Sequence, residues 1–340
     1  MNLPAAQQVF PPGEALAWAQ AVVDVRSPVE FEQGAIAGAV NIPLFSNHER
    51  AEIGTLYKQV GRDPALSLGM NLVEGRLAEY AARFEPYRNQ RVVVCCARGG
   101  MRSRSVAQLL VGMGYQAAQL AGGYKAFRNY LLKELETMPP RMVVIHGQTG
   151  VGKTRVLRKL NNAVDLEGLA QHRSSLFGAV NLSPRSQQWF ESLLLQRLKE
   201  IDPTKPVWIE GESRKVGDII LPNPLFRAMK GAVCVLLTAP LQVRVQRIIA
   251  EYAREDPATL EQLAAALGAL TPMLGKARVA DLTAHLRRGD LEAVVAPLLE
   301  EYYDLRYAHA MRNYTYAQTF DAADEEQTAR ALEAWAVPRE

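Results

Sequence analysis

Short apolar runs separated by segments of helical length characterise the first part of the chain. Val22–Arg26 (VVDVR) and Arg91–Cys96 (RVVVCC) are rich in β-branched residues and lead into polar or glycine-bearing turns, so both predict buried strands of a parallel sheet. Arg104–Gly112 has apolar residues at helical spacing and ends on a glycine, and Gln116–Leu120 predicts another short strand. This alternation predicts an α/β domain over residues 1–125.

An amphipathic helix predicted at Ala126–Met138 leads out of this first domain. Pro139 and Pro140 then end the helix, because proline lacks the helical N–H donor and restrains the residue before it. We therefore predict a linker helix over residues 126–140 and a second domain over residues 141–340.

The second domain begins with a predicted strand at Arg141–His146 (RMVVIH), a glycine-rich loop and a predicted helix at Lys153–Asn161. Val207–Glu210 and Ala232–Leu237 predict two more strands, and the helical-length segments between them indicate a second parallel α/β sheet. From about residue 241 the pattern is mostly helical and is interrupted by proline and glycine, which predicts a helical subdomain.

Composition narrows the class of protein further. The chain is 48% hydrophobic and 22% charged, as in ordinary globular enzymes, and a net charge of +3 is too small to indicate a nucleic-acid partner by itself. Three cysteines, without a CxxC pair or clustered histidines, predict neither a disulfide framework nor a zinc site. The sequence shows no secretory signal and no apolar run near the roughly 18 residues of a membrane span, so we expect a cytoplasmic protein without a membrane segment.

The glycine-rich loop carries the pattern G-x-x-x-x-G-K-T, between a predicted strand and a predicted helix as this phosphate-binding motif requires. Its glycines let backbone N–H groups converge on phosphate oxygens, Lys153 supplies a positive charge, and Thr154 offers a hydroxyl to Mg²⁺. The predicted phosphate-binding residues are Gly147, Thr149, Gly150, Val151, Gly152, Lys153 and Thr154. Glu210 is the nearest counterpart of the carboxylate that phosphate-hydrolysing enzymes place after a neighbouring strand.

A second loop, CARGGMR from Cys96 to Arg102, joins a predicted strand to a predicted helix. Backbone N–H groups and the helix N-terminus would stabilise a thiolate there, and Arg98 and Arg102 would hold an anionic group beside it. We predict Cys96 as the catalytic residue of an anion-binding loop completed by Arg98, Gly99, Gly100, Arg102 and Ser103, which suits either a persulfide or a phosphate-bearing substrate. Cys95, on the opposite strand face, and Cys234, inside an apolar run, are predicted to be buried core residues.

Several stretches of the first domain resemble the signature of rhodanese domains, namely DVRSPVEF (24–31), GAIAGA (34–39), NIP (41–43) and GGY (122–124). The resemblance implies that Cys96 carries a sulfur or selenium atom and that Asp24 and Arg26 belong to the scaffold. Simple rhodaneses commonly show C-x-x-G-x-R-S, whereas Arg102 here completes the spacing C-x5-R that is found in cysteine phosphatases.

The combination of both loops with two further stretches makes the whole chain similar to the tRNA 2-selenouridine synthase family. These stretches are DLEGLAQHR (165–173) with Phe177-Gly178, and EGESRK (210–215). The resemblance implies two steps on the wobble 2-thiouridine of the tRNA anticodon arm. A geranyl group from geranyl diphosphate is first placed on the sulfur; selenophosphate then supplies selenium, and the S-geranyl group leaves. The residues of Gly147–Thr154 would grip the diphosphate, and Cys96 with Arg98 and Arg102 would serve the selenium step.

The same resemblance implies no tightly bound cofactor, Mg²⁺ as an option at Thr154, a protein that supplies selenophosphate as a possible partner, and no role for DNA. Second-rank substrate candidates near predicted strand ends, where open α/β sheets bind ligands, are His172, Arg173, Glu210, Ser213 and Arg214. Arg244, Arg247 and Arg254 share one helical face in part, and they form either a solvated face or a surface for tRNA phosphates.

Three alternatives stay open from the residues alone. The first is an ATP-dependent kinase or ATPase domain fused to a tRNA sulfurtransferase. The second is a C-x5-R phosphatase, for which the sequence nominates no convincing acid to protonate the leaving oxygen. The third is a non-catalytic rhodanese module that regulates the phosphate-binding domain. The sequence also leaves open whether Cys96 carries a perselenide or only binds selenophosphate.

Overall fold

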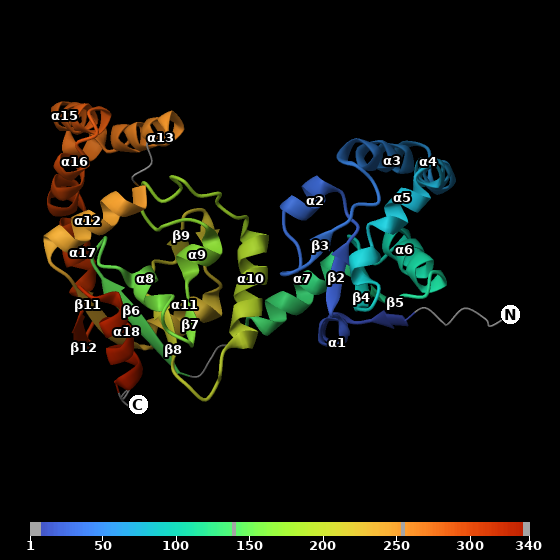
Figure 1. Cartoon of the computed structure of the whole chain (residues 1–340), viewed down its shortest axis with the longest axis horizontal. Helices are drawn as coiled ribbons and strands as arrows, with labels where there is room; N and C mark the ends of the chain where they lie inside the picture. Colours follow the sequence, from blue (N-terminus) through green and yellow to red (C-terminus); the bar gives the residue numbers. More distant parts are fainter. Residues whose placement is uncertain (1–7, 138–140, 253–255, 336–340) are drawn as a thin grey trace. The chain divides into compact units, whose positions relative to one another are not determined.

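The computed structural model describes residues 8–137, 141–252 and 256–335, which form two compact units (Figure 1). One unit extends to Leu135 and includes Glu191–Leu195, and the other comprises Glu136–Phe190 and the residues from Gln196 onward. Each unit has its own five-stranded parallel sheet, which confirms the predicted pair of α/β folds. None of the helices in the described ranges is long and apolar enough to cross a membrane.

The strands of the first unit all run parallel, in the order β1-β5-β4-β2-β3. They are β1 (Gln8–Phe10), β2 (Ala21–Asp24), β3 (Val40–Asn41), β4 (Arg91–Cys95) and β5 (Gln116–Leu120). Three of them, β2, β4 and β5, lie where the apolar runs predicted strands, and four of the five residues of β4 are buried. The other two, β1 and β3, are too short to give an apolar pattern in the sequence.

The helices of this unit are α1 (Pro12–Trp18), α2 (Pro28–Glu32), α3 (Asn47–Gln59), α4 (Arg62–Glu74), α5 (Leu77–Ala82), the 3₁₀ turn η1 (Glu85–Tyr87), α6 (Met101–Gly112) and α7 (Gly123–Glu134). The last of these is the predicted linker helix, and its apolar face, with Phe127 and Leu131 buried, belongs to the first unit. It runs from Gly123 to Glu134 instead of the predicted Ala126–Met138, and Met138 and the prolines after it lie outside the described residues.

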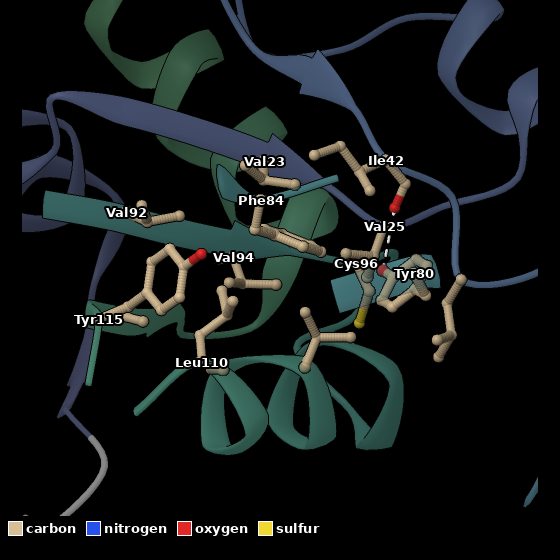
Figure 2. Packing of buried hydrophobic residues seen from close by; sticks show 14 of the residues in the cluster. Val23, Val25, Ile42, Tyr80, Phe84, Val92, Val94, Cys96, Leu110 and Tyr115 are labelled. Carbon is tan, nitrogen blue, oxygen red and sulfur yellow. Dashed lines mark hydrogen bonds between the residues drawn. The ribbon is translucent and has the colours of Figure 1, made fainter. Parts of the chain in front are cut away.

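Cys96 lies at the carboxyl end of β4, at the edge of the hydrophobic core of the first unit. Figure 2 shows its sulfur directed at the helix that carries Leu110, and Tyr80 beside it. The Tyr80 hydroxyl donates a hydrogen bond of 3.1 Å to the carbonyl of Ile42, so that this buried polar group has a partner. The core therefore fixes the strand end from which the cysteine loop starts.

The second unit contains a parallel sheet in the order β12-β11-β6-β8-β7, and a short antiparallel pair, β9 and β10. The strands are β6 (Met142–Gly147), β7 (Ala163–Val164), β8 (Val207–Glu210), β9 (Lys215–Val216), β10 (Ile219–Ile220), β11 (Val233–Thr238) and β12 (Tyr316–Asp321). The central strand β6 is buried along its whole length, as a strand with neighbours on both sides and helices on both faces requires.

Helices make up most of the rest of the second unit. They are α8 (Lys153–Leu157), α9 (Leu166–Ala170), α10 (Gln187–Glu200), α11 (Asn223–Lys230), α12 (Leu241–Tyr252), α13 (Pro257–Gly268), α14 (Thr271–Leu274), α15 (Lys276–Arg287), α16 (Leu291–Leu298), the π-helix η2 (Leu299–Tyr303), α17 (Asp304–Met311) and α18 (Glu325–Ala334). In Figure 1, α13 and α15 gather at the end of this unit farthest from α18.

Two predictions for the second unit need correction. The helix after the phosphate loop ends at Leu157 instead of Asn161, because it tightens into turns in which Lys159 and Leu160 bond to carbonyls three residues back. Within the described residues, the region after residue 241 contains six α-helices and the π-helix η2 as far as α17, as predicted, but also the edge strand β12, which pairs with β11. The largely exposed side chains of β12 gave no apolar run to indicate a strand.

Candidate functional site

The phosphate loop follows β6 and depends on glycine at two positions with left-handed backbone angles. Gly150 has φ of 78° and Gly152 has φ of 96°, a region that other residues rarely adopt. A Cβ atom at Gly150 would lie 2.9 Å from the carbonyl oxygen of Arg244, and one at Gly147 would lie 2.9 Å from that of Leu237. Gly150 thus needs glycine for both its conformation and its packing, Gly152 for its conformation, and Gly147 for its packing.

Lys153 is the first residue of α8, and its ammonium group lies over the loop. Its Nζ donates to the carbonyl of Gly147 at 3.3 Å and lies 5.9 Å from the centre of the Tyr307 ring. Burial lowers the pKa of Lys153, but Tyr307 and the carboxylates of Glu212 and Glu167 outweigh this effect and raise the pKa overall. Lys153 therefore keeps its charge and can receive the phosphate group of a ligand.

The hydroxyl group of Thr154 forms hydrogen bonds with two glutamates from different elements. Its Oγ1 lies 3.1 Å from Oε2 of Glu167, on α9, and 3.3 Å from Oε2 of Glu210, at the end of β8. The other oxygen of Glu210 accepts a bond of 2.6 Å from the backbone N–H of Glu167. Burial, together with the carboxylates of Glu167 and Asp165, raises the pKa of Glu210 well above its usual range.

The donor atoms around Thr154 fit a magnesium ion. A hydroxyl and two carboxylate groups form an oxygen-only set, which is the set that Mg²⁺ prefers. Among the described residues, no group of three or more His, Cys, Asp or Glu could hold a metal unaided. A magnesium ion here would therefore share its ligands with the phosphate oxygens of a substrate, as Mg²⁺ commonly does.

The phosphate loop opens into a cavity of about 410 Å³, within the usual size of small-molecule sites of roughly 300–1,000 Å³. Its polar end is formed by the loop from Gln148 to Thr154 together with Glu167 and Arg173. Its opposite end, which we name the apolar lobe, is lined chiefly by Phe177, Leu263, Leu267, Leu286, Val294 and Leu298. The cavity thus suits a ligand with an anionic head and a hydrocarbon tail.

The second-rank candidates divide into two groups. Arg173 lines the cavity, where it pairs with Glu251 and stacks 4.9 Å from the centre of the Tyr252 ring, and Glu210 reaches the site through Thr154. Among the described residues that line the cavity, His172, Ser213 and Arg214 are absent. Ser213 and Arg214 are exposed, and their side chains form hydrogen bonds with nearby residues: Ser213 donates to the carbonyl of Lys215, and Arg214 donates to Asn223. The ring of His172 packs against Gly217.

The hypothesis that Arg244 and Arg247 form a surface for tRNA phosphates is wrong. Their exposed fractions are only 3% and 9%, and both guanidinium groups bind the backbone of the phosphate loop. Arg244 donates to the carbonyl of Thr149 at 3.0 Å and forms an ion pair with Asp304 at 2.6 Å. Arg247 donates to the carbonyl of Val151 at 2.7 Å. Arg254, the third member of this hypothesis, lies outside the described residues.

Glu167, Glu212 and Tyr307 were not selected from the sequence, and Arg244 was selected only for a solvated face or a tRNA-phosphate surface. Glu167 falls in the stretch 165–173 that carries the family resemblance, which is the only signal that could have drawn attention to it. Glu212 lies near Lys153, and burial together with the Glu167 carboxylate raises its pKa to about 7. These residues come together only through the fold, since they lie on four separate elements or loops.

In the first unit, the Cys96 sulfur is buried, with an exposed fraction of 3% for the residue. Its Sγ lies 3.1 Å from the hydroxyl of Ser103 on α6. That hydroxyl accepts a bond of 2.9 Å from Gln119, whose amide also donates to the carbonyl of Gly99 at 2.8 Å. Ser103 therefore contacts the cysteine directly, and Gln119 holds both Ser103 and the loop in place.

The segment Gly122-Gly-Tyr124 closes over the cysteine loop. Gly99, Gly122 and Gly123 all have left-handed backbone angles of 60–66°. A Cβ atom at Gly123 would lie 2.1 Å from the carbonyl oxygen of Cys96, and the Tyr124 N–H donates to that same oxygen at 2.8 Å. This close approach explains why glycine occupies both segments.

The two arginines of the cysteine loop differ in their surroundings. Arg98 is exposed, whereas the guanidinium of Arg102 lies 2.7 Å from Glu30 on α2, in an ion pair that Arg50 joins at 3.4 Å. Burial would raise the pKa of Glu30, but its bonds with Arg102 lower it to about 2. In this structure Arg102 is thus paired with a carboxylate, and Arg98 is left available to an incoming anion.

The scaffold predictions for the first unit hold. Asp24 and Arg26 are buried and form an ion pair of 2.7 Å, and the guanidinium stacks 3.9 Å from the centre of the Tyr124 ring. Cys95 and Cys234 are buried free cysteines, and burial raises the pKa of both thiols. Neither thiol is suited to act as a nucleophile.

Fold and site together define the class of protein, a rhodanese-like domain joined to a phosphate-loop domain. Residues 13–130 match the family model of the rhodanese-like domain, and residues 140–336 match that of the tRNA 2-selenouridine synthase AAA domain. The second match covers more than half of the chain, and the chain belongs to the tRNA 2-selenouridine synthase family. It is accordingly a tRNA-modifying enzyme of the transferase class, and tRNA is its substrate.

One solved structure is also similar to part of the chain. It is the crystal structure of the N-terminal domain of a protein from Clostridium difficile 630 that is described as a candidate ATP/GTP-binding protein. The two sequences are 41% identical over 37% of this chain and 99% of the solved chain, with a TM-score of 0.35.

The Glu30 ion pair predicts a pH-dependent contribution to stability. Glu30→Gln should lower the free energy of unfolding of the first unit by about 2 kcal/mol at pH 7. Because the pKa is about 2 in the folded chain and 4.5 in the unfolded one, this contribution is complete above pH 4.5 and is lost as the pH falls toward 2. Urea unfolding of both proteins between pH 3 and pH 7 measures it. The exposed Glu74→Gln is the control, and an unchanged difference across this range would contradict the prediction.

Arg244 provides a second prediction, concerning the shape of the phosphate loop. Arg244→Met should destabilise the second unit by about 2–4 kcal/mol, because it leaves Asp304 and the Thr149 carbonyl without their partner. Chemical denaturation compares this variant with Arg287→Met, an exposed arginine on α15. Equal stability of the two variants would show that Arg244 does not hold the loop.

Glu212 predicts that anion binding at the phosphate loop depends on pH. Its pKa of about 7 means that it becomes charged as the pH rises from 6 to 8, which weakens the attraction of Lys153 for an anion. Calorimetry with inorganic pyrophosphate should show that Glu212→Gln gains about fivefold in affinity over the wild type at pH 8 and little at pH 6. The same ratio at both pH values would contradict this role, since ligand ionisation affects both proteins equally.

Proposed function

We propose that this chain converts the wobble 2-thiouridine in the tRNA anticodon arm to 2-selenouridine through an S-geranyl intermediate. In the first step the sulfur of the base attacks the first carbon of geranyl diphosphate, the carbon–oxygen bond breaks, and N3 of the base releases its proton. In the second step the selenium of selenophosphate adds to C2 of the base, the C2–sulfur bond breaks and geranylthiolate leaves and takes up a proton, and water then cleaves the selenium–phosphorus bond and releases phosphate. Both donors are those that the family membership suggests.

The observation that carries the first step is the cavity that connects the phosphate loop with the apolar lobe. Geranyl diphosphate has a diphosphate head for Lys153 and the loop, and a branched hydrocarbon tail without any polar atom. A buried wall of leucine, valine and phenylalanine side chains matches such a tail and offers few partners to the polar atoms of a nucleoside. The shape and polarity of the cavity therefore favour the prenyl donor over ATP.

The polar end of the cavity supplies what the departure of a diphosphate needs. Lys153, held charged beside Glu167 and Glu212, would neutralise the negative charge that develops on the leaving oxygen. Mg²⁺ bound by Thr154 and the diphosphate would supply further positive charge. The apolar lobe would keep water away from the reactive carbon.

The cysteine loop is the proposed site of the second step. Cys96 would carry selenium or hold selenophosphate, with the Ser103 hydroxyl at 3.1 Å as its hydrogen-bond partner and Arg98 as the cation that receives the anionic donor.

Two substitutions separate the two steps. Lys153→Ala should reduce geranylation by about 100-fold or more through loss of the charge on the leaving group, and Cys96→Ser should abolish selenium incorporation while geranylation continues. The experiment incubates thiolated tRNA with enzyme, geranyl diphosphate and selenophosphate, and measures the nucleosides by mass spectrometry. Lys159→Ala, an exposed lysine after α8, and Cys234→Ser, a buried cysteine outside the loop, are the matched controls.

Each alternative function gives a different result in this experiment. Tight binding of ATP with Mg²⁺ and no use of geranyl diphosphate would favour an ATP-dependent sulfurtransferase. Phosphatase activity that survives Lys153→Ala would favour a C-x5-R phosphatase. Continued selenium incorporation by Cys96→Ser would remove Cys96 from the reaction and leave the first unit with a regulatory role.

A further inference from the structure

On the side of α13 and α15, away from the phosphate loop, the apolar lobe is bounded by a wall of buried leucine side chains. Leu267 on α13 and Leu286 on α15 line the cavity there, and their exposed fractions are 0% and 3%. The two helices pack against each other, and α15 also packs against α16. In Figure 1 they lie at the far end of the second unit from α8, which carries the phosphate-binding Lys153.

We propose that Leu267 and Leu286 limit the length of the hydrocarbon chain that the enzyme accepts. This inference rests on the proposed use of a prenyl diphosphate. With the diphosphate fixed at Lys153 and Thr154, the distance from the loop to this wall sets how many isoprene units fit between them. The two leucines are specificity-determining residues, and they take no part in the chemistry.

The wall is rigid enough to act as such a limit, because buried side chains support it from behind. Leu270, Val279 and Leu282 belong to the same hydrophobic core, and Leu270 and Leu282 are at most 1% exposed. A core packed in this way cannot move aside for another five carbons without opening gaps elsewhere. A longer donor would therefore either be excluded or bind with its diphosphate displaced from the loop.

The wall formed by Leu299 and Tyr303 has a fixed geometry as well. Pro297 lies inside α16, and the chain continues as a π-helix that brings both Leu299 and Tyr303 to the cavity. Asp304 follows directly and pairs with Arg244, which holds the phosphate loop. The loop and the lobe are therefore joined by one chain of buried contacts, and their separation is defined.

The test is a competition between prenyl diphosphates of five, ten and fifteen carbons, with thiolated tRNA as acceptor and the full-length protein as enzyme. Leu286→Ala and Leu267→Ala should raise the ratio of farnesyl to geranyl transfer by about tenfold or more, because each removes part of the wall. Leu267→Phe should instead lower transfer from geranyl diphosphate relative to dimethylallyl diphosphate. Nucleoside mass spectrometry measures all three products in one reaction.

Leu282→Ala is the matched control. Leu282 lies one turn before Leu286 on α15, is equally buried and does not line the cavity, so this variant should lose stability without changing the donor ratio. Leu286→Val, a smaller change, keeps the test decisive if an alanine variant does not fold, and it should shift the ratio in the same direction. Thermal unfolding of every variant identifies those that are folded.

The outcomes distinguish a failure of the proposed prenyl transfer from a failure of the proposed length limit. A wild-type protein that transfers no prenyl group from any of the three donors would overturn the proposed function. A wild type that transfers geranyl, together with folded Leu267 and Leu286 variants that show the wild-type donor ratio, would overturn the length limit alone. A Leu282→Ala variant with the same shift as Leu286→Ala would also overturn it, because the effect would then arise from general loosening of the core.

Discussion

The second unit depends on two buried arginines that hold the phosphate loop from behind. A loop that offers its N–H groups to a ligand leaves carbonyl oxygens pointing elsewhere, and buried carbonyls need partners. Arg244 and Arg247, both on α12, provide these partners for Thr149 and Val151. Because the guanidinium group has five donors in a fixed plane, each arginine also binds a second element, and the loop becomes part of a rigid framework.

This framework explains how a phosphate site and a hydrocarbon site come to share one cavity. Arg244 connects the loop to Asp304, which follows the π-helix, and the π-helix forms a wall of the apolar lobe. A π-helix is uncommon and usually marks a functional position, and here it follows Pro297, which removes a regular helical bond from α16. The irregular turn thus places Tyr303 at the cavity and Tyr307 near Lys153.

Sequence patterns predicted the continuous motifs of this arrangement. They missed the contacts between residues that are distant in the sequence and that only the fold brings together. The phosphate loop and the cysteine loop are continuous motifs in which glycine is required by backbone angle, so both could be located from the residues alone. Glu167 and Arg244 carry no local signal for the roles that the structure gives them, because each acquires its role from a partner 13 or more positions away in the chain. For Arg102 the local signal was misleading. Its place in the motif predicted a contact with an anionic ligand, but its guanidinium group forms an ion pair with Glu30, which is distant in the sequence.

The two proposed donors require opposite surroundings, which gives a physical reason for a chain with two sites. An allylic carbon that loses diphosphate reacts with any water that reaches it, so the prenyl step needs a closed apolar cavity. Selenophosphate is a small charged molecule that must enter from water, and the exposed Arg98 in the Cys96 loop suits that entry. One cavity could not be both dry enough for the first donor and accessible enough for the second, and the S-geranyl base would therefore pass between two separate environments.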